Sequence, residues 1–169
     1  MSDATLGRPR TLQRDDHCED FDCGSERLNT DLRRFAGTNR RAGAARMYVS
    51  TRGKRVVGYY TLAYASIEHQ AAAPRIRQGL AQHPIPVMLL ARLAVDRGER
   101  GQGLDKGLVK DALLRTVQAA DIAGLRAVIV HAKDAAAKAF YKKFGFQPSP
   151  LDELHLMLLL KDVRKTLTD

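Results

Sequence analysis

The stretch that decides the fold is residues 90–107, which read LARLAVDRGERGQGLDKG. Its first part ends an apolar, partly alternating segment, 87–95, and this pattern predicts a strand. A turn at 96–98 and a short basic, glycine-rich loop at 100–103 follow. An amphipathic helix is then predicted to run to about residue 121.

The order strand, glycine loop and helix start favours a binding site for an anion, best a phosphate or a pyrophosphate. The first turn of a helix has unpaired backbone N–H groups, and the helix dipole makes that end electropositive. Gly101 and Gly103 let the backbone approach a ligand closely, and Arg100 adds a positive charge. An ordinary strand-to-helix turn is the alternative, because short glycine motifs often occur without a ligand.

The composition is typical of a soluble globular chain, with 169 residues, 44% hydrophobic and 28% charged. We expect one domain, 1–169, with a loose polar start at 1–14 that contains no apolar signal core. No apolar run approaches the ~20 residues that span a bilayer, which predicts a cytoplasmic protein without a membrane partner. Cys18 and Cys23 have no second cluster at metal-ligand spacing, so no metal site is predicted.

Positive charge is in excess, with 28 Lys and Arg against 19 Asp and Glu, a net charge of +9 and a pI near 9.9. This balance suits a polyanion such as nucleic acid, or an anionic cofactor. A helix beginning near Ser25 places Leu28, Leu32 and Phe35 on one face, flanked by arginines. A solvated basic surface is the alternative to a polyanion site. The arginines expected to contact a nucleic acid are Arg33, Arg34, Arg40, Arg41 and Arg46.

The remaining segments predict an α/β fold. The predicted strands are 46–51, 55–67, 87–95, 126–131 and 154–160, and a further helix is predicted at 135–144 with Asp134 as its cap. A hairpin turn is expected at 52–54, a loop at 71–86, and core or cleft positions for most of Tyr59, Tyr60 and Tyr64. This order gives a mixed sheet flanked by helices, and its later strand–helix–strand step requires a parallel pair.

Two of these segments resemble motifs of the GNAT N-acetyltransferases. Arg100-x-x-Gly103-x-Asp105 resembles the family's acyl-CoA loop, Arg/Gln-x-x-Gly-x-Gly/Ala. Residues 137–146, AKAFYKKFGF, resemble the family's closing Ala-x-x-Phe-Tyr-x-x-x-Gly-Phe segment, and Tyr141 falls on its tyrosine. Further motifs between 21 and 150 are similar to the GNAT toxins of bacterial toxin–antitoxin modules: FDCG at 21–24 with Leu28-Asn29, GYY at 58–60, RLAVD at 92–96, VHA at 130–132 and F-x-PSP at 146–150.

Those toxins acetylate the amino group of aminoacyl-tRNA and so stop translation. The resemblance implies the GNAT fold, a central mixed twisted sheet flanked by helices, with acetyl-CoA as cofactor and aminoacyl-tRNA as substrate. It also implies a homodimer and an antitoxin partner of the ribbon-helix-helix type. Tyr141 would be the general acid that protonates the leaving thiolate, although a purely packed aromatic is the alternative. The residues that would bind the cofactor are Leu93, Ala94, Val95, Arg100, Gly101, Gln102, Gly103, Leu104, Asp105 and Lys106.

Asp105 departs from the family pattern, which has Gly or Ala at this position. Counting round the helix places Asp105 with Leu108, Val109 and Ala112 on the arc that faces the sheet. A carboxylate there competes with phosphate for N–H donors and repels it. Two other functions stay open: an acetyltransferase for a small amine or a protein lysine and, because of Asp105, a catalytically weakened GNAT-fold binding protein. Asp105 is either native divergence or an attenuating change.

Overall fold

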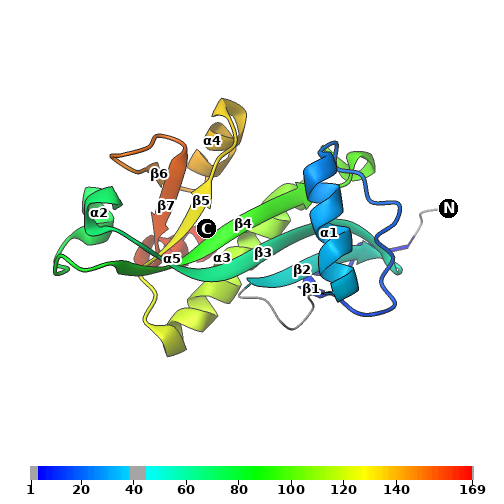
Figure 1. The fold of residues 1–169 in the computed structure, drawn as a ribbon, viewed down its shortest axis with the longest axis horizontal. Helices are drawn as coiled ribbons and strands as arrows, with labels where there is room; N and C mark the ends of the chain where they lie inside the picture. The colour runs from blue at the N-terminus through cyan, green and yellow to red at the C-terminus, as the bar shows by residue number, and fades with distance from the viewer. Residues whose placement is uncertain (1–3, 39–44, 169) are drawn as a thin grey trace. The chain divides into compact units, whose positions relative to one another are not determined.

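The computed structural model describes residues 4–38 and 45–168 (Figure 1). The strands are β1 (Arg10–Thr11), β2 (Ala45–Arg52), β3 (Arg55–Ile67), β4 (Ile85–Val95), β5 (Ala127–His131), β6 (Gln147–Pro148) and β7 (His155–Leu159). The helices are α1 (Glu26–Thr38), α2 (Pro74–Arg77), α3 (Leu104–Ala123), α4 (Ala135–Lys142) and α5 (Leu160–Thr168), with 3-10 turns η1 (His69–Ala71) and η2 (Arg97–Glu99).

The strands form a mixed sheet in the order β1-β2-β3-β4-β5-β7-β6. β4 and β5 are parallel, in the register Val87↔Ala127 to Leu90↔Val130, as the strand–helix–strand step requires. β1 and β2 are antiparallel, as are β5 and β7, and β6 and β7. The predicted fold class, an α/β fold with a mixed sheet flanked by helices, is confirmed.

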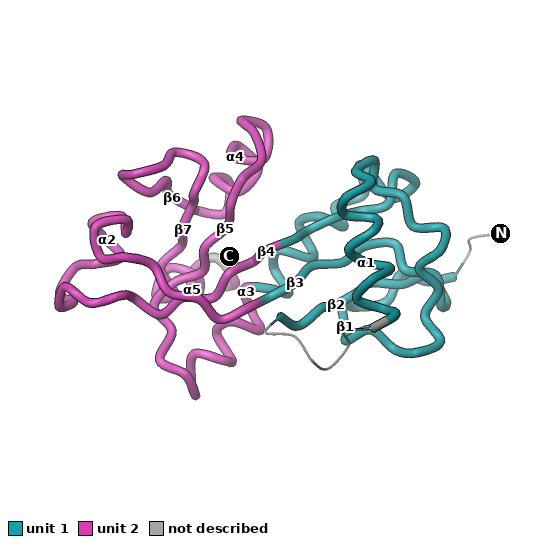
Figure 2. Tube along the Cα trace, in the orientation of Figure 1, with its two compact units in different colours: residues 1–62, 92–112 teal, residues 63–91, 113–169 magenta. Residues whose placement is uncertain are grey.

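The chain divides into two compact units (Figure 2). Unit 1 comprises residues 1–62 and 92–112, and unit 2 comprises residues 63–91 and 113–169. The boundaries between them fall within β3, β4 and α3.

In unit 1, α1 packs over β2 and β3 (Figure 1). Leu32 is fully buried and Leu28 and Phe35 are partly buried against the same cluster, so the predicted apolar face of this helix is confirmed. The other buried members of the cluster are Cys18, Phe21, Met47, Val49, Val56, Tyr59 and Ala94. The hydroxyl of Tyr59 donates to the Leu28 carbonyl at 2.7 Å, which satisfies a buried polar group and ties α1 to β3.

The core of unit 2 lies where β4, β5 and β7 meet the segment before β4. Its buried members are Ala72, Ala73, Ile76, Ile85, Val87, Ala127, Ile129, Met157 and Leu159. The prediction of a plain loop at 71–86 was incomplete, because this segment contains α2 and the first residues of β4. Pro74 begins α2, Ile76 is 3% exposed, and Arg126 Nε donates to the Ile76 carbonyl at 2.8 Å.

Two further predictions need correction. Residues 4–14, expected to be loose, include β1, and the Gly7 N–H donates to the Thr51 carbonyl at 2.8 Å. The last strand ends at Leu159, and a helix, α5, follows where none was predicted. Tyr59 and Tyr60 are fully buried and Tyr64 is 62% exposed, so most of the three tyrosines occupy core positions, as predicted. In the part of the chain that the structure describes, no helix has the length and apolarity needed to cross a bilayer.

Candidate functional site

The glycine-rich loop begins at a buried carboxylate. Asp96 directly follows β4 and is 8% exposed. Its Oδ1 accepts the Gly98 N–H at 2.9 Å, and its Oδ2 accepts the Asp22 N–H at 3.0 Å. One side chain therefore joins the end of β4, the start of the loop and a turn far away in sequence.

The loop reaches α3 through two residues in a backbone conformation that favours glycine. Gly101 has a φ of +79° and Gly103 a φ of +81°. Because a Cβ at either position would meet nothing within 4 Å, the backbone angle and not the space requires glycine. The Gly107 N–H donates to the Gly103 carbonyl at 3.0 Å, so the first turn of α3 directly follows the loop.

Asp105 lies in this first turn and uses one of its N–H groups. Its Oδ1 accepts the Lys106 N–H at 2.8 Å. Leu108, Val109 and Ala112 are fully buried, whereas Asp105 is only half-buried. The helical count placed Asp105 on the same arc, but its carboxylate bonds to the backbone at the helix start instead of entering the core.

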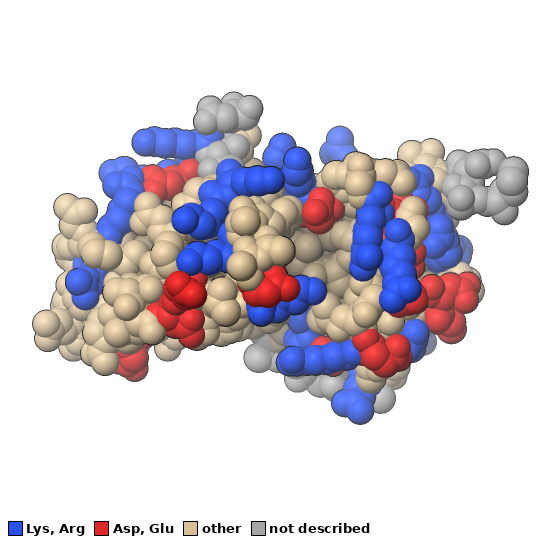
Figure 3. Space-filling model, turned by 90° about the horizontal axis from the view of Figure 1, so that it is seen from above, with Lys and Arg blue, Asp and Glu red and all other residues tan. Residues whose placement is uncertain are grey.

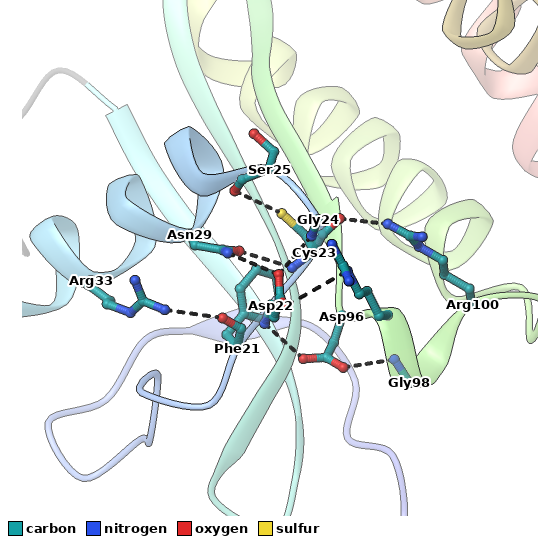
Figure 4. A network of polar contacts seen from close by, with 11 residues as sticks. Phe21, Asp22, Cys23, Gly24, Ser25, Asn29, Arg33, Asp96, Gly98 and Arg100 are labelled. Atoms are coloured by element: carbon teal, nitrogen blue, oxygen red, sulfur yellow. Dashed lines mark hydrogen bonds and ion pairs between the residues drawn. The ribbon is translucent and has the colours of Figure 1, made fainter.

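Arg100 is exposed and contacts a turn that precedes α1. Its Nη2 donates to the Cys23 carbonyl at 2.6 Å (Figure 4). The preceding residue, Glu99, is buried and makes two hydrogen bonds with Arg52, Nε to Oε2 at 2.9 Å and Nη2 to Oε1 at 3.0 Å. The loop is thus held against two other parts of unit 1.

The turn that receives Arg100, residues 21–25, is organised by Asn29 of α1. The Asn29 side chain is buried, at 2% exposure; its Oδ1 accepts the Cys23 N–H at 2.9 Å and its Nδ2 donates to Asp22 Oδ1 at 3.1 Å. The same Asp22 oxygen accepts the Gly24 N–H at 2.9 Å. The sequence showed Asn29 and Asp96 only as parts of motifs, because the bonds that give them their roles join distant segments.

Leu93, Ala94 and Val95 form the end of β4. Ala94 is buried in the core of unit 1, and Leu93 and Val95 are half-buried. The β4–β5 register ends at Leu90↔Val130, so these three residues lie beyond the part of β4 that pairs with β5. Just before them, Arg92 Nε donates to Asp31 Oδ2 at 2.8 Å and ties β4 to α1.

Three of the five arginines predicted to contact a nucleic acid lie in the described part of unit 1. Arg33 and Arg34 lie on α1 and Arg46 on β2, and all three are exposed. Arg33 Nη2 also donates to the Phe21 carbonyl at 3.4 Å. Arg40 and Arg41 lie outside the described residues. Figure 3 shows Lys and Arg side chains spread over one face of the molecule, with Asp and Glu among them.

Tyr141 lies on α4, in unit 2. Asp134 caps this helix as predicted, because its side chain accepts the Ala137 N–H at 2.8 Å. The Tyr141 ring is half-buried and makes edge-to-face contacts with Phe140 and Phe146, with centroids 5.1 and 5.6 Å apart. These contacts fix the ring. The loop residues, Arg100 included, therefore lie together in unit 1. Tyr141 packs against two aromatic rings in unit 2.

Within 4–38 and 45–168, no group of three His, Cys, Asp or Glu side chains is placed to hold a metal ion. Cys18 is buried, Cys23 is half-buried, and neither forms a disulfide within the described residues.

The comparison with known proteins agrees with this fold. A family model described as an acetyltransferase (GNAT) domain matches residues 43–148. The chain therefore belongs to the GNAT acetyltransferase family and is an acetyl-CoA-dependent acyltransferase, which confirms the predicted family and class of enzyme.

Its relatives include toxins. The chain is 47% identical to the tRNA-acetylating toxin of Mycobacterium tuberculosis over 161 residues, 95% of this chain and 96% of that protein. It is similar to the solved structure of AtaT complexed with acetyl-methionyl-tRNAfMet, with 31% identity, a TM-score of 0.87, and 95% and 98% of the two chains covered. It is also similar to a phenylalanine-for-tyrosine variant of the AtaT toxin bound to acetyl-CoA and the C-terminus of the antitoxin AtaR, with 30% identity, a TM-score of 0.78, and coverage of 98% and 99%.

The stability that the turn at 21–25 gives to the fold should depend on the ionisation of Asp22. Hydrogen bonds from the Gly24 N–H and the Asn29 amide, with Arg97 and Arg100 nearby, hold the pKa of Asp22 below its ordinary value. Since the folded-state pKa is the lower one, the ionised side chain stabilises the fold above the unfolded-state value of about 3.9, and this contribution is lost as pH falls through the folded-state value.

We expect the difference in the free energy of unfolding between the wild-type chain and Asp22→Asn to be largest near neutral pH and to shrink between about pH 5 and pH 2. Urea titrations across this range measure it, with Asp20→Asn, an exposed carboxylate two residues away, as the control. A difference that does not change with pH contradicts the role given to the Asp22 carboxylate.

Proposed function

We propose that this chain is a toxin that transfers the acetyl group of acetyl-CoA to the amino group of aminoacyl-tRNA and thereby blocks translation. The observation that carries the proposal is the 47% identity to a tRNA-acetylating toxin across 95% of the chain. The similarity to AtaT in complex with acetyl-methionyl-tRNAfMet supports the same substrate class. Acetyl transfer to charged tRNA, compared with transfer to polyamines and to lysine peptides, tests it directly. Transfer to polyamines or peptides alone would overturn it.

The reaction needs a neutral amine that attacks a thioester. An α-amino group has a pKa near 8, well below that of a lysine side chain, so about a tenth of it is already neutral near pH 7, whereas almost none of a lysine side chain is. The leaving thiolate, in contrast, needs a proton or strong hydrogen bonds. Tyr141 is the residue that we assign to this step, because its ring is held by Phe140 and Phe146 in the segment that resembles the family's tyrosine motif.

The loop in unit 1 is the part of the chain that would hold the cofactor, which supplies the activated acetyl group. The backbone of Leu93, Ala94 and Val95 would pair with the pantetheine arm as an added strand does, since these residues extend beyond the β5 register. The pyrophosphate would be held by the residues Arg100, Gly101, Gln102, Gly103, Leu104, Asp105 and Lys106. The positive φ angles at Gly101 and Gly103 and the helix start support this placement.

Exposed arginines provide the surface proposed for tRNA. Arg33, Arg34 and Arg46 are exposed in unit 1, and Arg40 and Arg41 follow α1 in the sequence. The net charge of +9 favours the same class of partner.

The relatives also support proposals about partners and location. The AtaT variant bound to the C-terminus of AtaR supports an antitoxin protein as a partner of this chain. We further propose that the antitoxin is of the ribbon-helix-helix type, that the chain forms a homodimer, and that it acts in the cytoplasm, where charged tRNA is found.

Tyr141→Phe should lower kcat by about 10²–10⁴-fold while the affinity for acetyl-CoA is nearly kept. The substitution preserves the ring and its aromatic contacts but removes the proton. The readouts are steady-state acetylation of charged tRNA and calorimetric titration of acetyl-CoA. Tyr64→Phe, on an exposed tyrosine of the same unit, is the matched control and should be fully active. Equal kcat for both variants rules the general acid out.

Reversal of charge at Arg33 and Arg34 to Glu should weaken tRNA binding and flatten its salt dependence by about one unit of slope for each phosphate that the helix no longer neutralises. Acetyl-CoA affinity should hardly change. Lys161→Glu with Lys165→Glu on α5 changes the net charge by the same amount and is the control. If both double variants bind tRNA with equally reduced affinity, net charge and not this helix governs binding.

Asp105→Gly should bind acetyl-CoA roughly tenfold more tightly, a difference of ~1.4 kcal/mol. The wild-type carboxylate occupies the Lys106 N–H and repels phosphate. Asp105→Asn keeps the shape and removes the charge, so its dissociation constant separates repulsion from occupation of the donor. Calorimetric titration of acetyl-CoA into the wild type and the two variants measures these dissociation constants. Tighter binding by the wild type would identify Asp105 as a simple helix cap.

A further inference from the structure

We propose that Cys23 and Gly24 form a seat for Arg100, and that Asn29 is the positioning residue that holds this seat. The inference rests on the proposed function, because it concerns the arginine assigned to the pyrophosphate. It adds a role for the turn at 21–25, which neither contains the glycine-rich loop nor adjoins it in the sequence.

The contact with Arg100 defines the seat. Arg100 Nη2 donates to the Cys23 carbonyl at 2.6 Å. Gly24 has a φ of +91°, and a Cβ there would lie 3.0 Å from the same Nη2 and 3.4 Å from Arg97 Nε. The turn therefore offers a hydrogen-bond acceptor and, beside it, the space that only glycine leaves.

Asn29 keeps the Cys23 carbonyl in place. It accepts the Cys23 N–H and donates to Asp22 from a site that is 2% exposed. Because water does not reach this amide freely, loss of either bond leaves a buried polar group without compensation. Asn29 and Arg100 approach the turn from opposite sides (Figure 4). Asn29 binds the N–H of Cys23 directly, and the Asp22 oxygen to which it donates accepts the N–H of the next peptide, whose carbonyl accepts from Arg100.

Asp96 fixes the distance between the seat and the loop. Its two oxygens accept the Asp22 N–H and the Gly98 N–H, and the Arg97 N–H donates to the Asp22 carbonyl at 2.9 Å. The two ends of the Arg100 contact are therefore parts of one hydrogen-bonded framework.

An arginine side chain that is already held in one conformation binds an anion at a lower entropic cost. The arginine side chain has many rotamers, and binding requires most of them to be given up. The guanidinium carries five N–H donors in a plane, so one bond to a carbonyl orients the group and leaves donors for a phosphate. The seat reduces the ordering that the cofactor must impose on Arg100.

The test compares two seat variants with two matched controls. Asn29→Ala removes the support, and Gly24→Ala pushes on the guanidinium without removing a buried polar group. Tyr59→Phe removes a different buried hydrogen bond to α1, the one to Leu28. Gly53→Ala also places a Cβ on a glycine in the left-handed region, at φ +63°, where that Cβ would lie 3.7 Å from Ala4. The readouts are the dissociation constant for acetyl-CoA, and kcat/KM with acetyl-CoA and with acetyl-pantetheine, which lacks the pyrophosphate.

Both seat variants should bind acetyl-CoA about five- to tenfold more weakly than the controls. Acetyl-pantetheine, which Arg100 does not contact in the proposed site, should be used with unchanged kcat/KM. In an Arg100→Ala background the seat substitutions should cause no further loss, because the two act through one interaction. A general loss of stability would affect both acyl donors and would add to the Arg100→Ala effect.

The measurements distinguish failure of the proposed seat from failure of the proposed cofactor site. Wild-type affinity in Gly24→Ala, or full additivity with Arg100→Ala, overturns the seat while leaving the enzyme intact. Should Asn29→Ala not fold, Gly24→Ala decides alone, since it acts on the same guanidinium. Full affinity in Arg100→Ala overturns the loop as the pyrophosphate site and thus the proposed cofactor placement itself.

Discussion

The candidate site depends on one buried carboxylate. Asp96 directly follows β4 and accepts N–H groups from Asp22 and Gly98, which lie 74 and 2 residues away. A carboxylate shielded from water needs such donors, and the two backbone segments in turn lose their partner if it is removed. This reciprocal requirement aligns the turn before α1 with the loop before α3, and the contact between Cys23 and Arg100 follows from that alignment.

The loop shows how stability of the free protein and affinity for an anion oppose each other. Gly101 and Gly103 hold the backbone in the left-handed region, which leaves it uncovered at the start of α3. Asp105 then places a carboxylate on the Lys106 N–H, where the helix dipole stabilises negative charge by about 0.3–1 kcal/mol. The same donor and the same field would attract a phosphate, so an interaction that stabilises the free protein here weakens binding of the proposed cofactor.

α1 connects the surface proposed for tRNA with the proposed cofactor loop. Leu28 and Leu32 pack into the core, Asn29 binds the turn at 21–25, and Arg33 lies exposed one helical turn after Asn29. Arg92 reaches back from β4 to Asp31 of the same helix at 2.8 Å. The two substrates of the proposed reaction would therefore be supported by neighbouring side chains of one helix.

Local signals in the sequence determined β4, the glycine loop, α3, the cap at Asp134 and the apolar face of α1, because each pattern lies within one segment. Only the tertiary structure decided β1, α2 and α5, since elements of two or four residues have no periodicity and the end of β7 has no breaker before α5. It also decided the roles of Asn29, Asp96 and Glu99, and the partner of Arg100. These depend on hydrogen bonds between segments distant in the chain, and no spacing within a segment reveals which donor a buried acceptor will meet.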